Sequence, residues 1–591
     1  MSNVPLVFEQ KGGRDGIAKT IACRWEGWNA QRRPKIEEYK ELRNYLFATD
    51  TSTTSNSGLP WKNTTTIPKL CQIRDNLHSN YVSALFPNDE WLKWDAASSS
   101  DNTRKKRIAI EAYMANKCRM GGFRTEASKL LYDYIDFGNA FATVDYEDSY
   151  RETEAGEKIT VFRGPKVRRL SPLDVVFDLT ATSFREAPKI VRAIVSLGEL
   201  ASMARSEPDQ RVFEKVMKLR NNACSNPSGY GLDDVMDKGE GYQMDGFGSY
   251  TEYLQSGQVE VLTYYGDIFD PKNKQIATGR RVIIIDRQWV LENEPFKGWV
   301  GNAPIYHVGW RFRPDNLWAM GPLDNLVGMQ YRIDHLENLK SDAMDLSIHP
   351  PLVISGEVEQ FQYGPGVEIH IDENGSITEL AKNAQWVIQA DNSIAMLEQR
   401  MEMYAGAPRE AMGIRTAGEK TAFEVQQLQN AAGRIFQEKI NQFEVELMEP
   451  ALNAMLELAA RNANNTEVVR TLDRDIGAAV FKTITKEDIT ANGVLRPIGA
   501  RHFAAQAQLL QNLTSVFNTP IGQMIAPHTS KLKMAELIED MLGLNRYELF
   551  KPNVAVAEDA ETQQTINSAQ EMVVGDEMAN GAPPTQGPPM Q

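Results

Sequence analysis

The stretch from Gly413 to Thr421, GIRTAGEKT, comes nearest in this sequence to a phosphate-binding motif. A P-loop has Gly, four residues, a second Gly and then Lys and Ser or Thr, because its backbone N–H groups surround the phosphates while the Lys contacts their outer oxygens. Gly413 and Gly418 have this separation, but Glu419 stands between Gly418 and Lys420. The motif is therefore degenerate.

The surroundings of this stretch predict the start of a helix instead. A P-loop follows a strand, whereas the residues before Gly413 have the pattern of a helix that ends near Gly406. Thr416 with Glu419, and Thr421 with Glu424, have capping-box spacing, in which the Thr side chain bonds the third N–H and the Glu bonds the N–H of the cap. We expect a loop that opens a helix, not an ATP site.

Other chemical motifs are absent or weak. The run 282–286, VIIID, resembles a Walker B strand, but it fits the return strand of a hairpin about 130 residues before the Gly-rich stretch. The seven histidines form no HExxH or HxH pattern, the four cysteines form no CxxC pair, and no Gly-x-Ser-x-Gly elbow occurs. The acidic run 145–148 fits a solvated turn at the end of a strand. We expect no enzyme activity, no metal site and no cofactor.

Composition limits the class of protein. The chain has 591 residues, 42% of them hydrophobic, and a net charge of −15. No apolar run approaches the roughly 20 residues that span a bilayer, and the first residues lack the apolar core of a signal peptide. The negative charge argues against binding DNA by general phosphate neutralisation, although it is compatible with DNA sliding past.

The elements change character along the chain. Apolar periodicity and turn residues predict the following order: helices at 36–47, 67–86 and 102–120, strands from 138, a polar surface excursion at 204–256, strands again near 258–291, a helix at 321–348, short strands in 350–383, a helix at 384–404, a long helix at 422–463 kinked at Pro450, further helices, and a mobile tail after 556.

One helix carries an ordered set of acidic residues. At 3.6 residues per turn, Asp324, Asp334, Asp342 and Asp345 fall within an arc of about 80°. Two interpretations stay open: a solvated acidic face, or a wall that repels phosphates.

Several stretches, in this order, resemble the portal (head-to-tail connector) proteins of tailed phages, in particular those of short-tailed, podovirus-type phages. They are LFPNDEWLKWD at 85–95, YDYIDFGNAFATVDYE at 132–147, LSPLDVVFDLTA at 170–181, GPLDNLVGMQYRIDHLENLKSDA at 321–343, TAFEVQQLQNAAGRIFQEKI at 421–440 and NGVLRPIGARHF at 492–503.

The resemblance implies an α+β portal fold with a defined division of the chain. The expected parts are a mixed α/β wing with part of the hip at 1–320, a first stem helix at 321–349, a small β-rich clip at 350–383, a second stem helix at 384–405, a channel (tunnel) loop at 406–420, a long kinked wing helix and its return at 421–483, a helical crown at 484–555, and a disordered acidic and Pro/Gly tail at 556–591.

The resemblance also implies a function. Portal proteins form a homo-oligomeric ring, usually of twelve subunits, at one capsid vertex, and double-stranded DNA passes through the central channel during genome packaging and ejection. The implied partners are terminase, the major capsid protein and tail adaptor proteins, with no membrane, and the implied location is the virion, after assembly in the host cytoplasm. The alternatives are a P-loop NTPase packaging motor and a capsid or scaffolding protein.

The resemblance assigns three groups of candidate site residues. The channel loop would contact DNA through Arg409, Met412, Arg415 and Lys420, although a basic loop that contacts neighbouring subunits is an equal alternative. The acidic channel wall would consist of Asp324, Asp334, Asp342 and Asp345. The clip would meet terminase and adaptor through Glu357, Glu359, Tyr363, Glu368 and Asp372.

Overall fold

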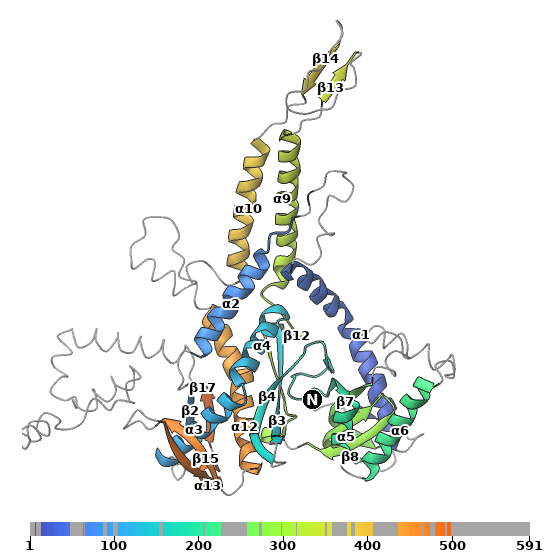
Figure 1. The fold of residues 1–591 in the computed structure, drawn as a ribbon, viewed down its shortest axis with the longest axis vertical. Coiled ribbons are helices and arrows are strands. Elements are labelled where there is room, and N and C mark those ends of the chain that lie inside the picture. The colour runs from blue at the N-terminus through green and yellow to red at the C-terminus, as the bar shows by residue number, and fades with distance from the viewer. Residues whose placement is uncertain are drawn as a thin grey trace, which may run out of the picture. The chain divides into compact units, whose positions relative to one another are not determined.

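The structure is a computed structural model that contains both helices and strands (Figure 1), which is compatible with the predicted α+β class. It describes residues 6–7, 14–47, 63, 65–86, 91–97, 104–152, 158–204, 207–225, 257–270, 275–296, 298–314, 316–348, 352–356, 375–379, 385–405, 435–462, 466–472, 479–490 and 493–497. The predicted channel loop at 406–420, most of the predicted crown and the predicted tail lie outside the described residues.

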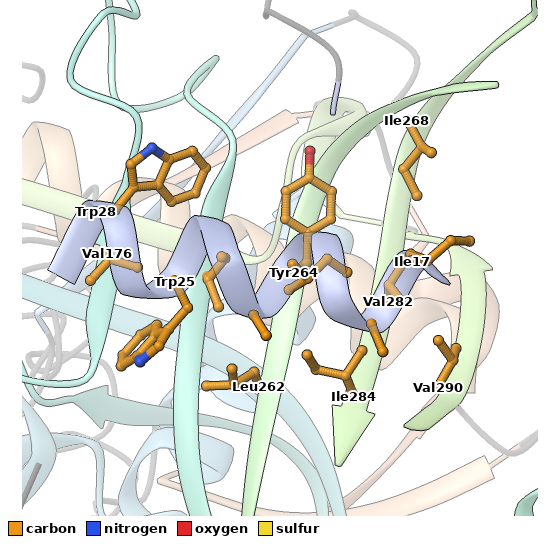
Figure 2. Close-up of a cluster of buried hydrophobic side chains, with 14 residues drawn as sticks. Ile17, Trp25, Trp28, Val176, Leu262, Tyr264, Ile268, Val282, Ile284 and Val290 are labelled. Atoms are coloured by element: carbon orange, nitrogen blue, oxygen red, sulfur yellow. The ribbon is translucent and has the colours of Figure 1, made fainter. Parts of the chain in front are cut away.

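The largest sheet carries helices on both faces. Its strands, in spatial order, are β5 (Val175–Phe177), β6 (Lys189–Ser196), β7 (Gln258–Asp270), β8 (Gln275–Ile285) and β9 (Trp289–Pro295), and β1 (Leu6–Val7) pairs with β7. Helix α1 (Arg14–Phe47) packs Trp25 and Trp28 on one face, against Leu262 and Tyr264 (Figure 2). Because successive strand residues point to opposite faces, Val259 and Val261 lie on the other face.

Helices α5 (Leu197–Met203) and α6 (Glu207–Ser225) cover that other face. Val212 and Val216 of α6 are buried in the cluster that contains Val261. The prediction of a polar excursion at 204–256 is therefore wrong for its first third. Few apolar residues at helical spacing are enough for a helix when a sheet lies beneath them.

A second sheet has the order β10 (Ile305–Gly309), β3 (Asn139–Glu152) and β4 (Lys158–Leu170). Three helices contact it: α3 (Arg104–Met120), α4 (Phe123–Asp136) and α12 (Glu449–Asn462). The acidic run 145–148 lies within β3, not in a turn, and Glu147 pairs across to Lys166 and Arg168 at 3.2 and 2.9 Å. The predicted solvated turn is thus a cross-strand ion-pair cluster.

The predicted helix, short strands and helix between 321 and 405 are confirmed as secondary structure. After the 3₁₀ turn η2 (Asp324–Leu326) come α9 (Val327–Ile348), β13 (Leu352–Ser355), β14 (Ser376–Glu379) and α10 (Gln385–Tyr404). Strands β13 and β14 form an antiparallel pair, and α9 and α10 lie side by side (Figure 1). We call α9 and α10 the helical pair.

The long helix predicted at 422–463 is described from Ile435 and is not uniformly α-helical. A π-helical segment, Glu444–Met448, directly precedes α12. Pro450 explains its position, since proline has no N–H and its ring clashes with the carbonyl four residues earlier. The added residue per turn accommodates this clash, as expected where a helix is perturbed.

The chain divides into two compact units, 1–465 with 485–499, and 466–484 with 500–591. In the second unit, the described residues form β15 (Thr466–Leu472) and β16 (Ala479–Thr485), which pair with each other. The predicted crown boundary at 484 differs from this division. Residues 493–497 form β17, which pairs with β2 (Leu92–Ala96) in the first unit.

The stretches that carry the resemblance meet in space. Strands β2 and β17 join 85–95 to 492–503. Gly138, with φ of 67°, lies so close to the start of the 321–343 stretch that a Cβ atom on it would be 2.3 Å from the nitrogen of Gly321. In the 170–181 stretch, the backbone carbonyls of Pro172, Leu173 and Val175 accept hydrogen bonds from the Arg32 guanidinium at 2.7–2.8 Å. These contacts tie distant sequence into one unit.

Candidate assembly interface

Helix α10 is apolar on two opposite faces. Ile394 and Met401 are buried. On the other side, Ile388, Met396 and Met403 fall within an arc of about 80° at 3.6 residues per turn, and they are 63%, 56% and 63% exposed. We call these three residues the α10 stripe. A helix that is apolar on both sides fits between two partners, and the residues that the structure describes cover one of these sides.

The rest of this projecting part carries more exposed apolar side chains. On β13, the neighbours Val353 and Ile354 are 49% and 48% exposed. Since neighbouring strand residues point to opposite faces, each face of the β13–β14 ribbon carries one half-exposed apolar side chain among the described residues. Further exposed apolar side chains of the helical pair are Tyr331, Leu339, Met344 and Tyr404. Such a concentration marks an interaction surface.

The predicted acidic wall is not a free surface on α9. Asp334 and Asp342 are 0% and 4% exposed, and Asp324 pairs with Lys35 of α1 at 2.8 Å. Burial raises the pKa of Asp324, opposed by the Lys35 charge. Asp345 is exposed but accepts a hydrogen bond from the Asn63 amide at 2.9 Å. The expectation of a phosphate-repelling wall is therefore corrected for the three inner residues.

An extended segment before α2 (Lys69–Leu85) covers these residues. We call Asn63 and Thr65–Ile67 the strap, and Gln330, Asp334, Asn338 and Asp342 the comb. Strap and helix-start N–H groups donate to comb side chains in four pairs: Asn63 to Asp342 at 2.9 Å, Thr65 to Asn338 at 2.7 Å, Ile67 to Asp334 at 2.9 Å and Leu70 to Gln330 at 3.2 Å. The acidic stripe is thus a row of acceptors for a backbone.

Two lysines connect the helical pair. Lys69, 6% exposed, contacts Glu402 of α10 at 2.7 Å and Glu398 at 3.9 Å. Lys340 of α9 pairs with Asp391 of α10 at 3.0 Å. The strap therefore contacts α9 through hydrogen bonds, and Lys69, two residues after the strap, contacts α10 through ion pairs.

Other predicted site residues are placed as follows. Residues 282–285 end β8, the return strand of the β7–β8 hairpin, as predicted, and Asp286 in the turn that follows forms a bidentate pair with Arg220 at 2.8 and 3.1 Å. The channel-loop residues Arg409, Met412, Arg415 and Lys420, and the clip residues Glu357, Glu359, Tyr363, Glu368 and Asp372, lie outside the described residues.

Sequence reasoning missed the strap, although it left a signal. Gln330, Asp334, Asn338 and Asp342 are spaced by four residues and all carry acceptor oxygens, two of them as amides. A charge-based search sees only the two carboxylates of this row. Among the described residues, no group of three His, Cys, Asp or Glu side chains could hold a metal ion, and no helix is long and apolar enough to cross a membrane.

No family model matches the chain, and no curated protein matches it significantly.

Proposed function

We propose that this protein is a phage portal that assembles into a ring at a capsid vertex and forms the conduit for double-stranded DNA during packaging and ejection. The observation that carries the proposal is the α10 stripe, opposite the face of α10 that packs in the chain. In a ring, the helical pair of each subunit contacts two neighbours, so that a helix with two apolar faces has a partner on each side.

The arrangement of elements supports the same proposal. A helix, a short β-ribbon and a second helix project from an α+β unit, which corresponds to the stem, clip and wing that the sequence resemblance implies. The exposed apolar residues of β13 would then contact neighbouring clips, terminase or a tail adaptor. The net charge of −15 favours weak binding to passing phosphates. This role rests on the whole surface, since all four residues of the predicted acidic wall make contacts within the chain.

The two alternatives have less support. In a packaging motor, Asp286 would serve a metal–nucleotide site, but its carboxylate pairs with Arg220 in a hairpin turn. A shell or scaffolding protein would use its exposed apolar residues for open lattices. The concentration of these residues on one projecting pair favours a closed ring instead.

Negative-stain electron microscopy of the purified full chain tests the proposal. We expect closed rings with a central hole and a single subunit number. Monomers, or lattices and shells of varied size, would reject it. ATP hydrolysis by the isolated chain that is lost in Lys420→Ala would point to the motor.

A further inference from the structure

The strap and the comb have matching periods. Two residues of extended chain advance about 6.6 Å, and four residues of an α-helix advance about 6.0 Å. Strap residues 63, 65 and 67 therefore bind helix residues 342, 338 and 334 in antiparallel order. Every second residue of the strap pairs with every fourth residue of the helix. The same match holds if the strap moves by two residues along α9.

The comb recognises mainly the backbone of the strap; of the strap side chains, the Asn63 amide also donates to Asp342, at 2.9 Å. Its acceptors take the N–H groups of Thr65 and Ile67, and the amides of Asn338 and Gln330 return hydrogen bonds to the carbonyls of Thr65 and Ile67 at 3.2 and 2.5 Å. Pro68, which has no N–H, stands at a position between the donating residues. Register is weakly specified where pairing depends on backbone groups alone.

Lys69 has two acceptors separated by one turn of α10. Glu402 lies 2.7 Å from its ammonium group and Glu398 lies 3.9 Å away. Because α10 runs antiparallel to α9, movement of the strap toward higher residue numbers on α9 is movement toward lower numbers on α10. A shift of one turn brings Thr65 to Asp342 and Ile67 to Asn338, and it brings Lys69 from Glu402 to Glu398.

The start of α2 can accommodate this shift. Its N-cap is Pro68, which makes no side-chain cap hydrogen bond, and its first turn holds no acidic residue. Leu70 is capped from α9 by Gln330. Each residue that leaves the helix and becomes extended lengthens the segment by about 1.8 Å, so the shift of about 6 Å needs the release of the first three to four residues of α2. Release of the first turn loses the burial of Leu70, which is 0% exposed, so the shifted register should be the less populated of the two.

We propose that the strap is a two-position latch, which holds α9 in either of two registers one helical turn, or about 6 Å, apart. The observed register is selected by Lys69 with Glu402, and the second by Lys69 with Glu398. The latch would let the helical pair change its position against the rest of the first unit in one discrete step. It does not depend on the ring proposal, because all its contacts lie within one chain.

Disulfide trapping tests the latch, in a Cys71→Ser background that removes the nearby native thiol. The pair Asn63→Cys with Asp342→Cys reports the observed register, since the Asn63 amide donates to Asp342 at 2.9 Å. The pair Thr65→Cys with Asp342→Cys reports the shifted register, and Asn63→Cys with Asn338→Cys reports a shift in the opposite direction, in which Lys69 has no second described acceptor.

After mild oxidation, intrachain disulfides are counted by non-reducing electrophoresis and mass spectrometry. We expect the first pair to close fully, the second in part, and the third not above background. The first pair also checks folding, since it contains the same Asp342→Cys substitution. Equal disulfide yields for the second and third pairs would overturn the proposal. Two low yields would show that the strap has one register, and two high yields would show that it moves without preferred positions.

The role of Lys69 in selecting the register is tested by adding further substitutions to the Thr65→Cys, Asp342→Cys variant. Glu402→Gln should raise its yield several-fold, and Glu398→Gln should lower it to background. No change in either variant would remove Lys69 as the selector and reject the two-position latch in this form.

Discussion

Removal of the α10 stripe should prevent assembly while the chain stays folded. The variant Ile388→Gln, Met396→Gln, Met403→Gln keeps helix propensity, because Gln and Met are close on that scale. Full burial of such an apolar side chain contributes about 1.5–3 kcal/mol. With about three-fifths of each side chain exposed in the single chain, an interface that buries them gains about 1–2 kcal/mol per residue, or about 3–5 kcal/mol for the three. The subunit dissociation constant should rise about a hundredfold to a few thousandfold.

Sedimentation velocity over a concentration series, with circular dichroism as the folding check, measures this change. The matched control is Met120→Gln, Ile194→Gln, Ile276→Gln, which removes three exposed apolar side chains, 57%, 48% and 55% exposed, from other elements. We expect the control to assemble as the natural chain does. If the stripe variant also assembles at unchanged concentration, the stripe is not the interface, and the main support for the ring is lost.

Three further predictions concern stability. Burial and the nearby lysine charge lower the pKa of His307 to about 3. Since the unfolded chain takes up a proton near pH 6.5 and the folded chain does not, the contribution of His307 to the free energy of unfolding should fall by about 2 kcal/mol between pH 7.5 and 5. Burial raises the pKa values of Asp133 and Asp334, which contribute with the opposite sign, so urea titration followed by Trp fluorescence measures the His307 part as the difference between the natural chain and His307→Phe. Gly138→Ala should leave little soluble protein, because its Cβ would be 2.3 Å from the backbone nitrogen of Gly321. The control Gly122→Ala, with a similar φ and open space around its Cβ, should lower the free energy of unfolding by only about 1 kcal/mol. Equal yields of soluble protein for the two variants would contradict the close approach at Gly138. Arg220→Met should cost about 3–5 kcal/mol in thermal unfolding, since it leaves a buried carboxylate without its guanidinium, and adding Asp286→Gly should restore most of it because Gly accepts the φ of 49°.

The helical pair and its ribbon could be predicted because their signals are local. Apolar spacing marks α9 and α10, and His349-Pro350-Pro351 ends the first helix by a rule that needs no tertiary context. The first half of α1 lies outside the helix predicted at 36–47, yet α1 runs from Arg14 to Phe47 and continues across Pro34. Burial of Trp25 and Trp28 on the sheet outweighs the local cost of the proline.

The candidate site could be predicted less well, because its contacts join distant sequence. The two faces of α10 are visible in its pattern, but which face the chain covers depends on α9, more than 35 residues earlier. The acidic residues of α9 were recognised as one face, yet the strap that uses them begins about 260 residues before them. A carboxylate that accepts backbone N–H groups and one that faces solvent look the same in sequence.

The comb binds the strap through acceptor oxygens and does not need negative charge, whereas a channel wall would act through negative charge. Two of the four comb residues are amides, and Asp334 accepts from the N–H of Ile67 while its second oxygen has no hydrogen-bond partner among the described residues. Burial raises the pKa of Asp334 to about 6, so the docked strap favours the protonated acid, and docking should strengthen as the pH falls from 7.5 through 6 toward 4. Asp334→Asn keeps the acceptor and removes the ionisation. We therefore expect it to dock the strap at pH 7.5 at least as firmly as the natural chain, without the pH dependence.

Hydrogen exchange of a peptide covering 63–70, corrected for the intrinsic pH dependence of exchange, measures strap docking. Asp334→Ala is the matched loss: it leaves the Ile67 N–H without its acceptor, which costs about 1–3 kcal/mol when the group is buried, so exchange there should accelerate about tenfold or more. If Asp334→Asn releases the strap as Asp334→Ala does, the negative charge itself holds the strap, and backbone recognition by the comb is refuted. If both variants keep the strap docked but alter DNA retention in filled particles, the acidic residues act on DNA, as the channel-wall interpretation expects.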